Sequence, residues 1–200
     1  MADATSFVPA QDTYSMPLMA HLEELRKRII FSVLGVIVGF LTCWSYADRI
    51  LGLVQQPLIR ALHHHGLSGG LVYLNPTEPF NLYLEVGFVA GLFTASPFVF
   101  YQLWLFIAPG LYRKERRYVL PFLLSTVGLF IAGGFFGYKM VYPASLDLLI
   151  GYGLRFQPMI TIAEYTKLFL TIIIGLGLIF EMPILVFFLA LMRVITARWM

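Results

Sequence analysis

The sequence predicts an all-α membrane protein, a bundle of helices that crosses the bilayer several times. Its 200 residues are 59% hydrophobic and only 12% charged, whereas a soluble domain is about 45–50% apolar and about 25% charged. The apolar residues also gather into four runs, each close to the ~20 residues that a helix needs to cross the hydrocarbon core. One soluble core could not hide this much apolar surface, so the composition indicates an integral membrane protein.

The N-terminal part of the chain divides into two segments. Residues 1–16 are polar and unpatterned, and we expect them to be disordered. They lack the cationic region and short apolar run of a secretory signal peptide. Residues 17–28 carry leucines at helical spacing among charged side chains, which predicts a short amphipathic helix at the membrane interface. Residues 17–200 are then expected to form one membrane bundle.

Four transmembrane spans are expected within this bundle. Their approximate bounds are 29–46, 86–108, 119–138 and 168–192. Pro97 should kink the second span, because proline removes one helical hydrogen bond. Pro183 should act likewise in the fourth span, where it frees the carbonyl of Ile179. Gly133 and Gly137 are spaced to let another helix approach the third span closely.

The long loop between the first two spans, residues 47–84, is predicted to begin with a helix lying along the surface. Its apolar residues recur on one helical stripe, which Pro57 interrupts. A triplet of His63, His64 and His65 follows. Adjacent residues on a helix point in different directions, so the triplet is a solvated loop or a poor site for a metal ion or a proton. The sequence leaves both alternatives open.

The distribution of lysine and arginine predicts the orientation. Nine of these cations fall before the first span, between the second and third spans, and after the fourth, while five are spread over the two longer loops. The positive-inside rule therefore places both ends of the chain and the loop at 110–118 in the cytoplasm. The total net charge of +3 is too small to suggest binding to nucleic acid.

Two acidic residues stand within the cationic segments of that cytoplasmic side. Glu24 lies in HLEELRKR at 21–28, and Glu115 lies in the basic loop that follows the second span. Each has an ordinary explanation, because Glu24 can pair with Lys27 or Arg28 on its own helix and Glu115 can balance its cationic neighbours. The residues alone favour these explanations, although each acid could also bind a cationic ligand, since guanidinium groups match carboxylate geometry.

The end of the second span is aromatic. Tyr101, Trp104 and Phe106 are typical of side chains that anchor a helix at the membrane interface. Gln102 is expected to form a hydrogen bond with a neighbouring helix.

Several separated motifs resemble the TatC family, the core receptors of the twin-arginine protein translocase. They are PLMAHLEELRKR at 17–28, Pro57-Leu58, PTEP at 76–79, SPFVFYQLWLFIAPGLYRKERR at 96–117 and FEMP at 180–183. The resemblance covers roughly residues 17–200. Members of this family have six spans, so the chain resembles a family member without its last two.

The resemblance implies a function and a location. It implies a multi-pass protein of the bacterial inner membrane that binds twin-arginine signal peptides through Glu24 and Glu115, close to Phe106. It implies that Pro57 is a structural position in a periplasmic surface helix. It also implies assembly with TatA- and TatB-like single-span partners, in a larger complex that contains further copies of the chain.

Glu181 lies near the middle of the fourth span, where a charged side chain is costly. It could bond within the bundle as a structural group, sit in a wet hollow, or dock a polar residue of a partner helix, and the resemblance favours the last two. A proton-coupled transporter of small solutes, with Glu181 as its relay, is the alternative function. We predict no catalytic residue, cofactor or resident metal, because no catalytic motif is present.

Overall fold

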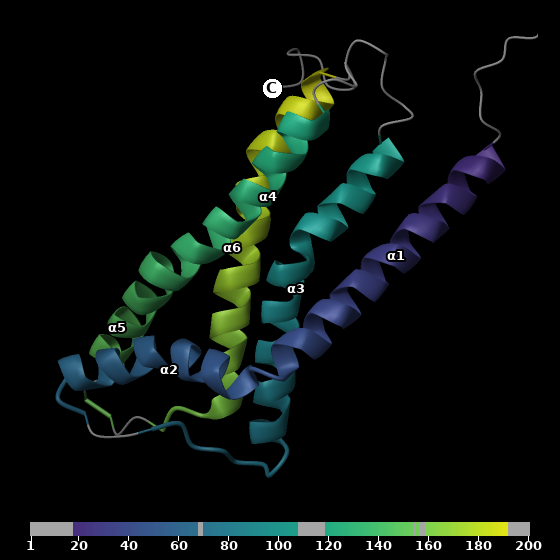
Figure 1. Cartoon of the computed structure of the whole chain (residues 1–200). Coiled ribbons are helices and arrows are strands. Elements are labelled where there is room, and N and C mark those ends of the chain that lie inside the picture. The colour runs from purple at the N-terminus through teal and green to yellow at the C-terminus, as the bar shows by residue number, and fades with distance from the viewer. Residues whose placement is uncertain (1–17, 68–69, 108–118, 154, 157–158, 192–200) are drawn as a thin grey trace, which may run out of the picture.

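The computed structural model describes residues 18–67, 70–107, 119–153, 155–156 and 159–191. Within them the regular structure is helical apart from one isolated β-bridge between Val72 and Thr161, and loops join the helices (Figure 1). The elements are α1 (Leu18–Trp44), α2 (Ala47–His64), α3 (Glu78–Ile107), α4 (Val119–Phe136), the π-helical turn η3 (Gly137–Val141), α5 (Tyr142–Gly153) and α6 (Ile162–Leu191). The expected disordered segment 1–16 lies outside the described residues.

The predicted all-α membrane bundle is confirmed. Four helical stretches are long and apolar enough to cross a membrane: His21–Trp44, Glu78–Ile107, Val119–Gly153 and Ile162–Ala190. The helices extend past several expected span ends. In particular, η3 and α5 continue from α4 without a break, so that the third span is followed by further helix rather than by a loop.

α1 is one continuous helix, so the separate interfacial helix expected at residues 17–28 is wrong. No proline or glycine near the junction of Arg28 and Ile29 ends the helix there. The leucine, glutamate and arginine residues of this part of α1 all favour helix. α1 packs along α3. At Gly39 the two backbones nearly touch, because an added Cβ would lie 2.7 Å from the carbonyl oxygen of Gly91.

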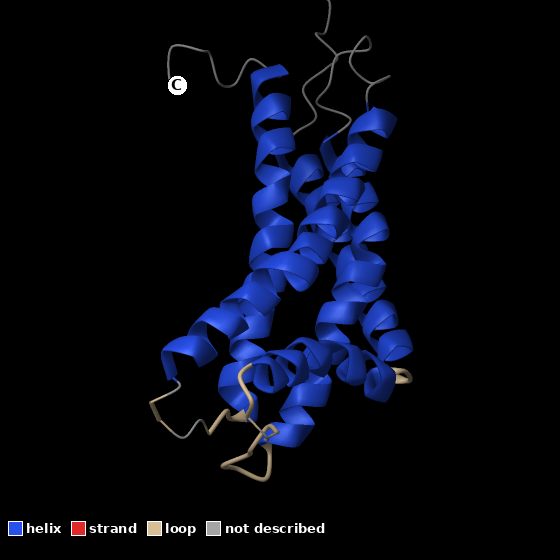
Figure 2. Cartoon of the chain, turned by 90° about the vertical axis from the view of Figure 1, so that its left-hand side faces the viewer, coloured by secondary structure: helices blue, strands red, loops and turns tan. Residues whose placement is uncertain are grey.

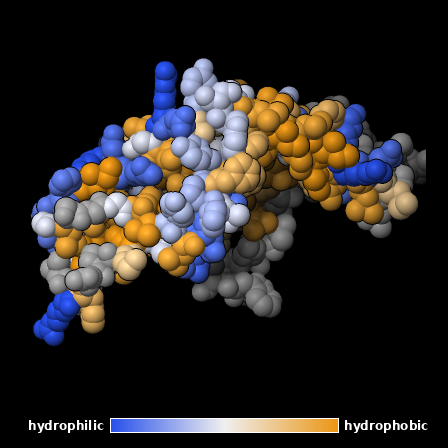
Figure 3. Space-filling view, turned by 90° about the horizontal axis from the view of Figure 1, so that it is seen from below, coloured by the Kyte–Doolittle hydropathy of each residue, from blue (hydrophilic) through white to orange (hydrophobic). Residues whose placement is uncertain are grey.

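The face of α1 that turns away from α3 is apolar, and the part of the chain that the structure describes leaves it exposed. Seen from below, the arm that α1 forms on the right is coated with hydrophobic side chains (Figure 3). The exposed residues are Ile29, Ile30, Val33, Leu34, Ile37, Val38 and Leu41. Such a face suits the hydrocarbon core of a bilayer.

α2 is the predicted surface helix, and it runs crosswise beneath the bundle (Figure 1). It does not stop at Pro57, which is buried within it. Proline lacks an N–H, so the carbonyl of Leu53, four residues earlier, loses its helical donor. The hydroxyl of Tyr138 in η3 donates to this carbonyl at 2.7 Å. Tyr165 of α6 likewise donates to the carbonyl of Val54, so α2 is bonded to the bundle at its proline.

Pro97 shows the same compensation within α3. The helix runs through Pro97, which leaves the carbonyl of Phe93 without its helical N–H donor. The buried hydroxyl of Ser96 donates to that carbonyl at 2.7 Å. The helix therefore tolerates its proline, because the freed carbonyl keeps a hydrogen-bond donor.

α4 and α6 pack closely where the sequence predicts it. A Cβ added at Gly133 would lie 2.6 Å from the carbonyl oxygen of Leu176 on α6, and one at Gly137 would lie 3.2 Å from the Leu176 side chain. These contacts place the glycine-lined face of α4 and η3 against α6.

The two ends of the bundle carry different elements (Figures 1 and 2). At one end α1 and α4 begin, while α3 and α6 finish; we call this the α3–α4 end. At the other end lies α2 together with the described loops before α3 and before α6; we call this the α2 end.

Candidate functional site

Three polar residues of α1 form a stripe at the α3–α4 end. His21, Glu24 and Arg28 are spaced by three and four residues, which places them on one side of the helix. This side meets Gln102 and Phe106 of α3, which are themselves four residues apart. The two antiparallel helices therefore face each other through two matched layers of polar and aromatic side chains.

Arg28 connects the two helices. It donates one hydrogen bond of 3.2 Å to Oε1 of Gln102 and another of 3.2 Å to Oε1 of Glu24. Gln102 is buried, with 6% of its surface exposed. The expectation that Gln102 bonds a neighbouring helix agrees with this contact. Of the two partners expected for Glu24, the structure selects Arg28.

The second layer is aromatic. The ring of Phe106 stacks on the imidazole of His21, with centroids 4.5 Å apart and planes inclined by 20°. Phe106 thus lies one helical turn beyond Gln102, next to the residues that hold Glu24. Trp104 differs from the expected interfacial anchor: it is buried between Phe122 of α4 and Phe188 of α6.

Glu24 keeps access to solvent although it is paired. Its side chain is 23% exposed, and its bond to Arg28 uses Oε1. A carboxylate offers about four lone-pair positions, so a second guanidinium could bind without displacing Arg28. Arg28 in turn fixes the rotamer of Glu24 from the α3 side.

Glu115 falls in residues 108–118, outside the described part of the chain. The described residues on either side are Ile107 at the end of α3 and Val119 at the start of α4, and both lie at the α3–α4 end (Figure 1). Both flanks of the segment that carries Glu115 therefore stand at the same end of the bundle as Glu24.

Glu181 lies on the buried face of α6. That face continues through Ile173, Gly177 and Phe188 at spacings of four and seven residues, and Glu181 itself is only 4% exposed. Neither of its carboxyl oxygens has a hydrogen-bond partner in the part of the chain that the structure describes. The backbone of Phe130 in α4 lies close to this carboxyl, so a structural role within the bundle stays a prediction beside the other two.

An apolar hollow of about 450 Å³ lies between α4 and α6, one turn from Glu181. Pro183 of α6 and Pro121 of α4 are on its walls, with Phe122, Ser125, Leu129, Ile184 and Phe187. Pro183 lies inside α6 and takes the helical donor from the carbonyl of Ile179. No side chain among the described residues donates to that carbonyl, unlike those freed by Pro57 and Pro97.

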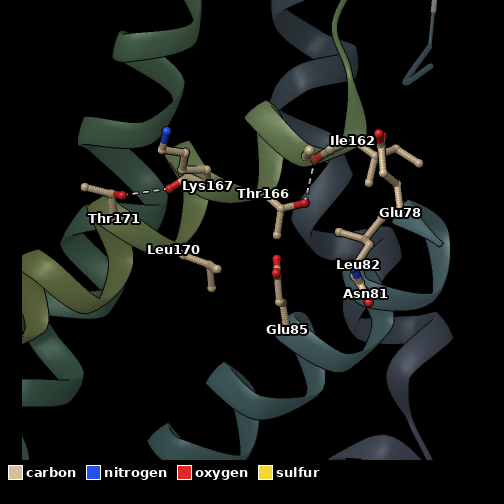
Figure 4. Close-up of a pocket in the computed structure, with 10 residues that line it drawn as sticks. Glu78, Asn81, Leu82, Glu85, Ile162, Thr166, Lys167, Leu170 and Thr171 are labelled. Atoms are coloured by element: carbon tan, nitrogen blue, oxygen red, sulfur yellow. Dashed lines mark hydrogen bonds between the residues drawn. The ribbon is translucent and has the colours of Figure 1, made fainter. Parts of the chain in front are cut away.

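A pocket of about 420 Å³, lined by both polar and apolar side chains, opens at the α2 end between the first turns of α3 and α6 (Figure 4). Glu85 of α3 points across it toward Thr166 of α6, whose hydroxyl donates to the carbonyl of Ile162 at 2.7 Å. The sequence did not predict this pocket, because its walls come from residues 78–85 and 162–171, which meet only in the folded chain. It lies at the opposite end from Glu24.

Sequence reasoning did not assign roles in the site to His21 and Arg28. Their spacing to Glu24 was a usable signal, since residues at i, i+3 and i+7 share one helical face. What the sequence could not show was that Gln102 and Phe106 would stand opposite them.

Comparisons with known proteins agree on one family. The family described as "Sec-independent protein translocase protein (TatC)" matches residues 20–200. A relative named Sec-independent protein translocase protein TatC from Koribacter versatilis (strain Ellin345) is 62% identical over 185 residues, which are 92% of this chain and 68% of the relative. One of the same name from Magnetococcus marinus is 40% identical, over 84% of this chain and 61% of its own length.

Solved structures give the same result. A crystal structure titled "Twin Arginine Translocase Receptor- TatC in DDM" superimposes with a TM-score of 0.79 at 32% identity, covering 88% of this chain and 78% of that chain. A second TatC crystal structure gives a TM-score of 0.80. The chain thus spans about two thirds of the length of the relatives it matches.

Proposed function

This chain belongs to the TatC family of Sec-independent protein translocase proteins, which are translocase components and not enzymes, and on that premise we propose that it is the receptor for twin-arginine signal peptides. Binding takes place at the α3–α4 end. Glu24 and Glu115 each accept hydrogen bonds from one arginine of the signal. Phe106 provides apolar contact beside them.

The observation that carries this proposal is the fixed carboxylate of Glu24. A surface glutamate normally loses side-chain entropy when it binds a ligand. Here Arg28 holds the carboxylate, and buried Gln102 holds Arg28. Much of the ordering is therefore complete before the ligand arrives, which favours affinity.

Two acids suit a ligand with two adjacent guanidinium groups. A planar guanidinium offers paired N–H donors that match a carboxylate, whereas the ammonium of lysine is a point charge. One glutamate on α1 and another between α3 and α4 would receive the two arginines from different elements. The cationic side chains next to both acids repel other lysine- or arginine-rich peptides, which do not place two guanidinium groups on the two acids.

Glu181 serves partner assembly in this proposal. Its carboxyl group is buried without a hydrogen-bond partner among the described residues, and the hollow beside Pro183 lies on the same stretch of α6. A single-span helix of the TatA or TatB kind, carrying a polar side chain, would satisfy the carboxyl while its apolar residues fill the hollow. The transporter alternative is not favoured, because the similar proteins are translocase components.

The orientation follows from the charge distribution. The α3–α4 end, with the cationic residues at 26–28 in α1 and the cationic segment 113–117 after α3, faces the cytoplasm of a bacterial cell, and the α2 end faces the periplasm. In this arrangement the signal peptide meets the acids on the side where folded precursors accumulate.

The proposal is tested with a photo-crosslinkable signal peptide added to membranes that contain the chain. A twin-arginine peptide should crosslink, and a twin-lysine peptide should crosslink much less. Glu24→Gln should lower the yield, whereas Glu23→Gln, at an exposed neighbouring position, should leave it unchanged. Equal yields for the two peptides would refute the paired-carboxylate account.

A further inference from the structure

The end of α2 brings two adjacent histidines together at the α2 end of the bundle. α2 ends at His64, and His65 follows as its C-cap with φ −93° and ψ 8°. The imidazole rings of His64 and His65 contact each other edge to face, with centroids 5.1 Å apart. His63, one residue earlier, is exposed and takes no part in the cluster.

Asp147 of α5 faces both rings. Its Oδ1 lies 3.7 Å from Nδ1 of His64 and 3.7 Å from Nε2 of His65. The three atoms all lie within 4.8 Å of one another. Helix packing sets this approach: α2 lies against α5, and Cε1 of His65 is 3.7 Å from the position of a Cβ added at Gly151.

These distances are too long for hydrogen bonds, which span about 2.7–3.2 Å from nitrogen to oxygen. Nε2 of His65 and Oδ1 of Asp147 are nevertheless buried, and neither has a hydrogen-bond partner among the described residues. Buried polar atoms without partners are uncommon and costly. A tetrahedral zinc ion, bound at about 2.0–2.2 Å, holds its ligand atoms roughly 3.3–3.6 Å apart. The two separations from Oδ1 of Asp147, 3.7 Å each, are close to that spacing, and the two histidine nitrogens lie within 4.8 Å of each other.

We propose that His64, His65 and Asp147 bind a divalent transition-metal ion of the zinc class, which joins the end of α2 to α5. Two imidazoles with one carboxylate suit zinc or copper, whereas magnesium and calcium prefer oxygen ligands alone. The C-terminal end of a helix carries partial negative charge and favours a cation. The side chain of His64 is 75% exposed, so water can complete the coordination.

Such an ion would strengthen the attachment of α2 to the bundle. The carbonyls of Leu53 and Val54, near the middle of α2, accept hydrogen bonds from η3 and α6, and the metal would hold the C-terminal end of α2. The site is independent of the signal-peptide face, since it lies at the opposite end of the bundle.

The test uses the chain purified in detergent through a tag without histidine and stripped with EDTA. Zinc is titrated against a chromophoric zinc indicator, and the thermal midpoint is recorded with zinc, with magnesium and after renewed EDTA. We expect one zinc per chain and a thermal midpoint that rises with zinc, returns with EDTA and does not respond to magnesium.

Two variants and one control decide whether these three residues are the ligands. His65→Ala and Asp147→Asn should each weaken zinc binding at least tenfold. Asp147→Asn keeps the side-chain volume, so this variant gives the result in case His65→Ala does not fold. His63→Ala should bind zinc within twofold of the parent chain. Absence of stoichiometric zinc binding, or unchanged binding by Asp147→Asn, would overturn the proposal. So would an equal loss in His63→Ala, because the exposed triplet alone would then be the chelator.

Discussion

Arg28 of α1 and Gln102 of α3 are joined by a hydrogen bond of 3.2 Å, although they stand 74 residues apart in the sequence. The same guanidinium bonds Glu24 on its own helix. A buried amide in the second span therefore sets the position of a carboxylate at the surface. In the proposed receptor, Gln102 acts on signal-peptide binding through Glu24 without touching the peptide.

Gln102→Leu should lower crosslinking to the twin-arginine peptide several-fold while the protein remains in the membrane. Leucine keeps the apolar packing but removes the acceptor that holds Arg28. Gln102→Glu should retain most of the yield, because its carboxylate still accepts from Arg28. If the glutamate variant were as weak as the leucine variant, the positioning role of Gln102 would be wrong.

Tyr138→Phe should destabilise the attachment of α2. The variant removes the donor to the carbonyl of Leu53, and a typical hydrogen bond contributes about 0.5–1.5 kcal/mol. For a chain of this length the thermal midpoint in detergent should fall by roughly 2–4 °C per kcal/mol. Tyr46→Phe is the matched control and should change little, because this ring is exposed and its hydroxyl forms no hydrogen bond among the described residues.

The coupling between Pro57 and the Tyr138 hydroxyl is tested by combining substitutions at the two residues. Pro57→Ala supplies an N–H to the carbonyl of Leu53, so Tyr138→Phe should cost less in that background than in the parent chain. Additive thermal shifts would show that the hydroxyl and the proline are not coupled.

Glu181→Ala should leave insertion and signal-peptide binding largely intact, because removing the acid makes insertion easier. Transport and crosslinking to a TatA-like helix should fall. Glu181→Gln should retain more of both, since its amide still donates and accepts hydrogen bonds. Glu164→Gln, in the exposed first turn of α6, should behave as the parent.

Two other outcomes at Glu181 would change the interpretation. If alanine unfolds the bundle in detergent while glutamine does not, the group is structural. If glutamine is as inactive as alanine while partner binding stays normal, ionisation itself is needed, and the transporter alternative gains support.

Reporter fusions test the orientation. A reporter that is active only in the periplasm should be active when fused after Arg155, in the described loop at the α2 end, and inactive when fused at Lys114. The opposite pattern would place the acids of the α3–α4 end outside the cytoplasm and contradict the proposed receptor face.

Local patterns predicted much of the fold. The number of spans follows from the apolar runs, and the surface helix α2 follows from its amphipathic stripe. The pairing of Glu24 with Arg28 follows from helical spacing. The close packing at Gly133 follows from small residues. In each case the signal lies within one helix, so a short window of sequence contains it.

The long-range contacts could not be predicted in this way. Tyr138 reaches Leu53 because η3 passes over the proline of α2, and Asp147 meets His65 because α5 lies along the same helix. Both depend on where the chain turns after the third span. The sequence suggested a loop there, whereas the helix continues to Gly153.

The most direct test of the receptor proposal is a double-mutant cycle between Glu24 and the signal peptide. Binding of peptides with two arginines, or with one replaced by glutamine, is measured for the parent chain and for Glu24→Gln. A charge-assisted hydrogen bond contributes about 1.5–3 kcal/mol, so the parent chain should prefer the twin-arginine peptide by about tenfold or more. For one of the two arginine positions, most of the preference for arginine over glutamine should vanish in Glu24→Gln. The same preference should persist in Glu23→Gln. An undiminished preference in Glu24→Gln would contradict a bond between Glu24 and the signal.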